Sequence, residues 1–199
     1  MEINSTPEQR EDLAFYYAVA VQLLRYPSSE AISDIHTALS LLNDQIEPSQ
    51  ALLARELATE FENLLALPQE GALSEYTRLF VSNYPGPTCR PIEAVYREKV
   101  LVGECTEKVA AQYWTVGLEG KGQPPDHILT ELAFLQYVMN YEPDEHFGAE
   151  DLETLHNDFI ANHILQWVPA WLIDIRNFAQ YPYYPKVADF LSWLFTIRE

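Results

Sequence analysis

The sequence contains few of the residues that build tight hairpins, disulfide frameworks or membrane spans. Only 7 glycines and 2 cysteines occur among the 199 residues. Scarce glycine argues against an all-β fold, because tight hairpin turns depend on it. Cys89 and Cys105 are too few for a disulfide framework and form no Cys-x-x-Cys pair, which favours a reducing compartment.

Long apolar runs are also lacking. The longest, such as residues 167–173, are far shorter than the ~20 residues that a membrane span needs. The first residues show no basic segment followed by an apolar one, which is what a signal peptide has. We therefore expect a soluble, cytoplasmic protein with no stable membrane insertion.

Basic residues are outnumbered. There are 12 Lys and Arg against 30 Asp and Glu, a formal net charge of -18. Such a chain repels phosphate backbones, so we expect no nucleic-acid partner. The same charge attracts a cationic partner and accelerates its encounter with the protein. Hydrophobic residues make up 48% and aromatic residues 13% of the chain, which is typical of a folded core.

Apolar residues recur every three or four positions along most of the chain, which is the helical period. Thr6 and Gln9 are spaced as in a capping box at a helix start, and Ser28 is a suitable cap for the next helix. The segments 82–91 and 120–125 are rich in proline and glycine and read as loops. We expect an all-α fold: one domain, residues 1–199, forming a helical bundle of about nine helices.

The same pattern predicts three helices in the second half of the chain. Asp126 is expected to cap a helix that runs to about Tyr141. A helix from Ala149 to about Gln166 is expected to end before Pro169, which begins a further helix.

Several residues have the chemistry of a reactive site. Glu153 and His156 form Glu-x-x-His, half of a di-iron carboxylate motif, but a second copy is lacking. Cys89 lies in the first loop without a sequence signature that links it to a histidine. His127 and Glu131 share a helix face at i and i+4, yet one His and one Glu do not complete a metal site. We therefore expect no catalytic, metal or cofactor site.

Four separated motifs resemble the TorD/DmsD/NarJ family, the maturation chaperones of molybdenum oxidoreductases. They are Glu75–Phe80 (EYTRLF), Pro91–Tyr96 (PIEAVY), Pro125–Leu135 (PDHILTELAFL) and the spaced set Phe159, His163, Trp167 and Pro169. Their order and spacing match the family over residues 10–195. This chain has Ile92 where the family often has an aromatic residue.

The resemblance implies an all-helical protein that binds the twin-arginine signal peptide of a molybdoenzyme catalytic subunit. It holds that precursor in the cytoplasm until the molybdopterin cofactor is inserted, and it is not an enzyme. The residues that the resemblance assigns to the signal-peptide site are Tyr76, Leu79, Phe80, Pro91, Glu93, Tyr96, Asp126, His127 and Glu131. Phe159, His163, Trp167 and Pro169 are read mainly as packing residues.

Other classes of protein remain open at this point. One is a small helical di-iron metalloprotein, for which the single Glu-x-x-His motif is the only support. The other is a helical adaptor that binds an unrelated partner through its aromatic residues. We expect a monomer, with a dimer as the alternative.

Overall fold

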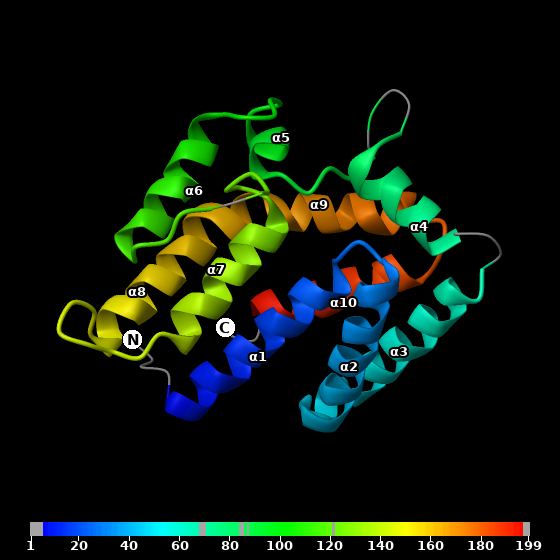
Figure 1. Cartoon of the computed structure of the whole chain (residues 1–199), viewed down its shortest axis with the longest axis horizontal. Helices are drawn as coiled ribbons and strands as arrows, with labels where there is room; N and C mark the ends of the chain where they lie inside the picture. The colour runs from blue at the N-terminus through cyan, green and yellow to red at the C-terminus, as the bar shows by residue number, and fades with distance from the viewer. Residues whose placement is uncertain (1–5, 68–70, 84–85, 87, 121, 197–199) are drawn as a thin grey trace. The chain divides into compact units, whose positions relative to one another are not determined.

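The computed structural model describes residues 6–67, 71–83, 86, 88–120 and 122–196. It confirms the all-α fold of about nine helices (Figure 1). Within these residues there is no strand, and the only β-type pairing is an isolated antiparallel bridge between Ile92 and His127. None of the described helices has the length and apolar character to cross a membrane.

The chain divides into two compact units. Unit 1 contains the residues up to Ala18 together with Pro91–Pro169, and unit 2 contains Val19–Arg90 together with the residues from Ala170 onward. Two helices, α1 (Pro7–Leu23) and α9 (Leu165–Phe178), contribute residues to both units. The single domain expected over residues 1–199 stays a prediction.

Among the described residues, unit 1 contains four complete α-helices, a π-helical segment and a cluster of aromatic rings. Its complete elements are α5 (Glu93–Arg97), α6 (Glu104–Thr115), α7 (Ile128–Asn140), α8 (Ala149–Phe159) and the π-helical segment η3 (Ile160–Ile164). Helices α7 and α8 lie side by side (Figure 1). Between them the rings of Phe134 and Phe159 have centroids 4.7 Å apart, and Tyr113 of α6 completes the cluster.

Unit 2 has its own aromatic core. Its complete elements are α2 (Ser29–Gln45), η1 (Pro48–Gln50), α3 (Ala51–Leu65), α4 (Gly71–Tyr76), the π-helical segment η2 (Thr77–Val81) and α10 (Tyr183–Thr196). The Phe80 ring lies 5.1 Å from the rings of both Tyr76 and Tyr184 and 6.1 Å from that of Trp171. These ring contacts join η2 to α9 and α10.

Two expected helix caps are confirmed. The backbone N–H of Thr6 donates to Gln9 Oε1 at 2.8 Å, and the Gln9 N–H donates to Thr6 Oγ1 at 3.3 Å, so the capping box at the start of α1 is complete. Ser28 Oγ accepts the Ala31 N–H at 3.2 Å at the start of α2. Both caps satisfy backbone donors that a helix start otherwise leaves to water.

The expected cap at Asp126 is wrong. Helix α7 begins at Ile128, and its N-cap is His127, whose Nδ1 accepts the Leu129 N–H at 3.2 Å. Asp126 lies one position earlier, in a turn that is closed by a hydrogen bond from the His127 N–H to the carbonyl of Pro124 at 3.1 Å. Its carboxylate instead accepts the N–H of Ala94 at the start of α5, so Asp126 caps a different helix.

The expected helix start at Pro169 is also wrong, because Pro169 lies inside α9. A proline in a helix lacks one backbone N–H and so removes one hydrogen bond, here to the carbonyl four residues earlier. The helix expected to run from Ala149 to about Gln166 changes to a π-helix over Ile160–Ile164 before α9 begins. The hydrogen-bonding pattern thus changes one turn before the proline and the chain stays helical through it.

Candidate functional site

Two of the family-like motifs pair directly in unit 1. The Glu93 N–H donates to the carbonyl of Asp126 at 2.9 Å, and the Ile128 N–H donates to the carbonyl of Pro91 at 3.0 Å. These bonds flank the bridge between Ile92 and His127. The pairing fixes the starts of α5 and α7 against each other, although they are more than thirty residues apart in the sequence.

Glu93 is a fully buried carboxylate with two nitrogen partners. The Arg97 guanidinium, one turn later on α5, donates to Glu93 Oε1 and also to the carbonyl of Asn162 at 3.2 Å. His163 Nδ1 lies 3.1 Å from Glu93 Oε2. A buried carboxylate is tolerated only when it is paired and hydrogen-bonded, and these two partners meet that requirement.

Glu131 of α7 is a second fully buried carboxyl group. The indole N–H of Trp167 donates to Glu131 Oε2 at 3.2 Å, and no donor among the described residues reaches Oε1. Burial, reinforced by the charge of Glu93, raises the pKa of Glu131 well above its usual range. The raised pKa favours the protonated acid, whose O–H is a donor suited to the neighbouring Glu93 carboxylate.

Asp126 is the third fully buried carboxyl group. Its Oδ2 accepts both the Ala94 N–H and the Thr106 hydroxyl at 3.0 Å, which joins the starts of α5 and α6. Burial raises the pKa of Asp126, and these two hydrogen bonds act against that rise. Pro125, the residue before Asp126, is held by Tyr113, whose hydroxyl donates to the Pro125 carbonyl at 2.7 Å.

His127 is buried and neutral at physiological pH. Its Nδ1 accepts a backbone N–H, so the proton of the neutral ring is on Nε2. Burial lowers the pKa of His127 to about 4. Of the two other predicted residues in this unit, Pro91 is buried, whereas Tyr96 is half-buried with its ring 5.7 Å from that of Trp167.

The first motif lies in unit 2, and its three predicted site residues are packed in the core there. Tyr76, Leu79 and Phe80 are all buried. Burial raises the pKa of Tyr76 to about 12. Their assignment to a signal-peptide site stays a prediction, because the structure shows them in contact with other core side chains.

Glu75, in the same motif, repeats the arrangement around Glu93. It is buried, and the Arg78 guanidinium donates to both of its oxygens at 2.9 and 3.1 Å. The N–H of Gln180 donates to Glu75 Oε1 at 2.7 Å, and Arg78 donates also to the carbonyl of Phe178. Each unit thus contains a buried glutamate whose carboxylate forms an ion pair with an arginine one helical turn later.

Sequence reasoning assigned His163 and Trp167 mainly to packing and missed Arg97. The structure shows that all three contact the buried carboxyl groups. The i, i+4 spacing of Glu93 and Arg97 was a signal for their ion pair. The contacts of His163 and Trp167 carried no such local signal, because their partners lie 70 and 36 residues away.

The residues that suggested other chemistries have structural contacts. His156 is buried, and its Nε2 lies 2.9 Å from the Tyr17 hydroxyl. Burial raises the pKa of Cys89 to about 12, so the thiol stays protonated and is a poor nucleophile. In the described part of the chain no three His, Cys, Asp or Glu side chains are grouped as metal ligands.

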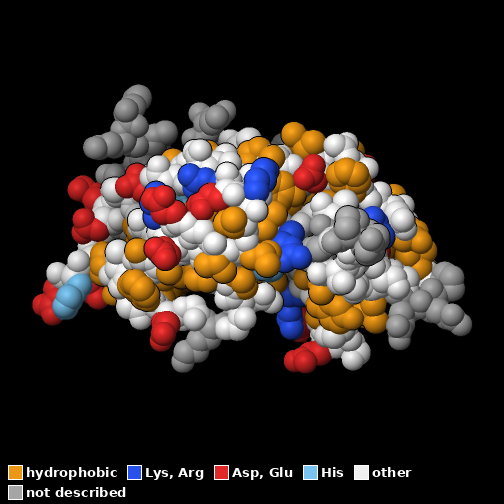
Figure 2. Space-filling model, turned by 90° about the horizontal axis from the view of Figure 1, so that it is seen from above, with side chains coloured by type: hydrophobic (Ala, Val, Ile, Leu, Met, Phe, Trp, Pro, Cys, Tyr) orange, Lys and Arg blue, Asp and Glu red, His pale blue; other side chains and the backbone are white. Residues whose placement is uncertain are grey.

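An exposed apolar turn joins α5 to α6. The side chains of Val100, Leu101 and Val102 are 44%, 55% and 70% exposed. Figure 2 shows that apolar side chains reach the surface on one face of the molecule. The turn is held at both ends: Lys99 has a left-handed backbone (φ 62°), and the Glu98 carboxylate accepts the N–H groups of Glu104 and Cys105. A fixed exposed apolar segment is suited to contact with a partner.

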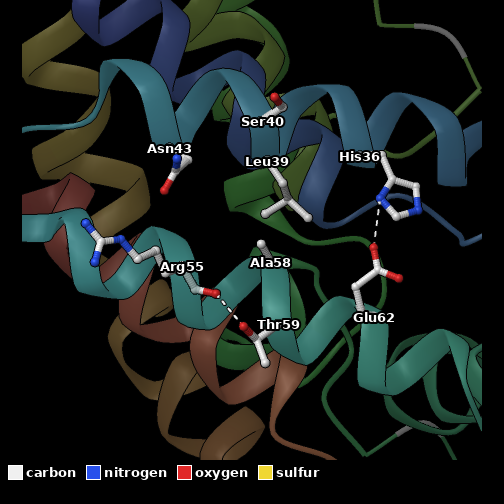
Figure 3. A pocket seen from close by; sticks show the side chains of 8 residues that line it. All are labelled: His36, Leu39, Ser40, Asn43, Arg55, Ala58, Thr59 and Glu62. Atoms are coloured by element: carbon white, nitrogen blue, oxygen red, sulfur yellow. Dashed lines mark hydrogen bonds and ion pairs between the residues drawn. The ribbon is translucent and has the colours of Figure 1, made fainter.

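Unit 2 contains an open hollow of about 500 Å³ between α2 and α3 (Figure 3). Six of its eight lining residues are polar, including His36 and Glu62, whose side chains contact each other at 3.3 Å. None of the predicted site residues lines it. We therefore place the candidate site around the paired starts of α5 and α7 in unit 1.

Comparison with known proteins agrees with these features. The model of the nitrate reductase delta subunit family matches residues 30–172, most of the chain, and the chain belongs to this family. The chaperone protein TorD of Vibrio parahaemolyticus is 27% identical over 164 residues, which cover 81% of this chain and 68% of that protein. The expected relationship to the TorD/DmsD/NarJ family is thus confirmed, as is its chaperone rather than enzymatic character.

A solved structure supports the fold. A candidate redox enzyme maturation protein from Archaeoglobus fulgidus superimposes with a TM-score of 0.63 over 98% of this chain and 97% of that one. The two sequences are 19% identical, so the similarity concerns the fold alone.

Proposed function

We propose that this protein is a cytoplasmic chaperone that binds the twin-arginine signal peptide of a molybdoenzyme catalytic subunit. It retains the precursor until the molybdopterin cofactor has been inserted and the subunit is ready for export. The observation that carries this proposal is the meeting of three family-like motifs around one buried carboxyl cluster in a chain of the nitrate reductase delta subunit family.

The charge of the protein suits such a ligand. A twin-arginine signal peptide combines a cationic segment with an apolar segment. A protein with a net charge of -18 attracts the cationic segment and increases the rate of encounter. That attraction is screened over a Debye length of about 8 Å at physiological ionic strength, so it contributes more to the association rate than to the affinity of the bound peptide.

The apolar segment of the peptide requires an apolar surface. The exposed turn at Val100–Val102 provides one, and it follows α5 directly in the chain. Burying apolar area contributes roughly 25 cal/mol per Å². Tyr96, half-buried on α5, and His127 at the start of α7 lie at the edges of the carboxyl cluster, and we assign them to contact with the peptide.

Isothermal titration calorimetry with a synthetic twin-arginine signal peptide tests the proposal. The matched control is the same peptide with both arginines replaced by lysines, which preserves its charge and its apolar segment. We expect saturable binding of the twin-arginine peptide and weaker binding of the lysine peptide, because guanidinium groups pair with carboxylates through two parallel hydrogen bonds. A protein that binds neither peptide contradicts the proposal.

A further inference from the structure

We propose that Arg97 is an internal ligand: its guanidinium occupies a guanidinium-binding site, formed by Glu93 and the carbonyl of Asn162, that an arginine of the partner takes when it binds. The structure shows this site filled by Arg97 itself. The identity of the partner as an arginine-containing peptide rests on the proposed function, whereas the existence of the site does not.

The acceptors of this site are fixed in place. Glu93 is fully buried, His163 Nδ1 lies 3.1 Å from its second oxygen, Oε2, and the Glu131 carboxyl group is its neighbour. Glu131 is held in turn by the Trp167 indole at 3.2 Å. The carboxylate therefore keeps its orientation when its guanidinium partner changes. Preorganised acceptors of this kind reduce the free-energy cost of binding.

Arg97, in contrast, is free to leave. It is the last residue of α5, and 32% of its side chain is exposed. Rotation of its side-chain torsions takes the guanidinium into water without movement of the helix. The residues that follow, Glu98 to Gly103, form the surface turn that carries the exposed apolar side chains. An incoming arginine thus arrives beside the apolar surface that the rest of the peptide needs.

The exchange preserves the buried charge. One guanidinium replaces another, so the Glu93 carboxylate is paired both in the free protein and in the complex, and only the open state between them lacks a guanidinium. In Arg97 one nitrogen, Nη1, donates to both Glu93 Oε1 and the Asn162 carbonyl. A lysine ammonium is a compact, strongly hydrated point charge, whereas a guanidinium is more weakly hydrated and loses less hydration when it enters this buried site. The site therefore selects arginine over lysine.

Competition by an internal ligand lowers the apparent affinity for the external one. The apparent dissociation constant equals the intrinsic constant divided by the fraction of molecules whose site is open. If Arg97 leaves the site open in about a tenth of the molecules, its removal tightens binding of an arginine peptide about ten-fold. The contact between Arg97 and Glu93 is therefore autoinhibitory: it lowers the affinity for the bound arginine and favours release of the client.

The experiment uses the full chain with Arg97→Ala and, as a more conservative change, Arg97→Gln, whose shorter, uncharged side chain keeps a polar group at the end of α5 but removes the guanidinium. The control is Arg25→Ala, which removes the same charge from a partly exposed pair with Asp34. Each variant is titrated calorimetrically with the twin-arginine peptide and its lysine counterpart. Melting temperatures are measured with methylguanidinium and with methylammonium, both at millimolar concentration.

The proposal expects Arg97→Ala to bind the arginine peptide about ten-fold tighter than the wild type does, with no gain for the lysine peptide. Methylguanidinium should raise the melting temperature of Arg97→Ala but not that of the wild type or Arg25→Ala, and methylammonium should not act. Unchanged or weaker binding in a folded Arg97→Ala, or in Arg97→Gln if the alanine variant does not fold, overturns it. If the wild type binds no peptide, the proposed function fails, and selective rescue by methylguanidinium still decides whether the site exists.

Discussion

Replacing Glu131 by Gln should stabilise the protein increasingly as the pH rises. In the folded protein burial and the neighbouring Glu93 raise the pKa of Glu131 well above its usual range. In the unfolded chain the same carboxyl group ionises near pH 4.3. Its stabilising contribution is therefore complete below the unfolded pKa and is lost as the pH rises toward the folded pKa.

The magnitude follows from proton linkage. Each pH unit over which the folded carboxyl keeps a proton that the unfolded one has lost lowers the free energy of unfolding by about 1.4 kcal/mol. Glutamine has no proton to lose, and its amide imitates the protonated acid: the NH₂ group donates to Glu93 and the carbonyl accepts from Trp167. Between pH 5 and pH 7 the variant should gain up to about 3 kcal/mol relative to the wild type.

The assay is urea unfolding followed by circular dichroism at pH 5, 6 and 7. The difference between variant and wild type removes contributions that both share, such as those of Asp126 and His127. Glu107→Gln, a change at an exposed position of α6, is the matched control for the lost side-chain charge. Parallel stability profiles for Glu131→Gln and the wild type would refute the assignment of a protonated Glu131.

Two further substitutions test single contacts. His127→Ala removes the Nδ1 acceptor that caps α7, so we expect the free energy of unfolding in urea to fall by about 1 kcal/mol. We also expect weaker binding of the twin-arginine peptide. Normal peptide binding would show that His127 is only structural. Arg78→Ala leaves the buried Glu75 without its guanidinium partner and should lower the free energy of unfolding by about 3 kcal/mol. The control Arg176→Ala, in a more exposed pair with Asp189, should lower it by less than about 1 kcal/mol. Equal losses would contradict the buried ion pair in unit 2.

The sequence was sufficient for features that depend on neighbouring residues. The capping box of Thr6 and Gln9 was predicted correctly because both partners lie within one helical turn. Asp126 was assigned to the wrong helix because its true partner, the N–H of Ala94, lies 32 residues away and is brought near by a bridge of a single residue pair. Local preference favours a cap on the next helix, and tertiary pairing overrode it.

In the candidate site, too, contacts between neighbouring residues could be predicted from the sequence, whereas long-range contacts could not. The resemblance assigned Glu93 and Glu131 to the signal-peptide site but gave no indication of their burial. Both are fully buried, and burial together with the charge of Glu93 raises the pKa of Glu131. A carboxyl group's protonation state depends on burial and on charges that arrive from other helices, so no pattern along the chain predicts it. The i, i+4 spacing of Glu93 and Arg97 indicates their pairing, but the second acceptor of Arg97, the carbonyl of Asn162, lies 65 residues away and has no local signal.

Hydrogen–deuterium exchange of the full chain, with and without the twin-arginine peptide, tests the central claim most directly. We predict slower exchange in residues 91–102 and 126–131 when the peptide is bound, because these segments form the edge of the carboxyl cluster and the apolar turn. Helices α2 and α3, which line the hollow of unit 2, should exchange at an unchanged rate and serve as the internal reference. Protection confined to α2 and α3, or absent from residues 91–102, would contradict the assignment of the binding site to unit 1.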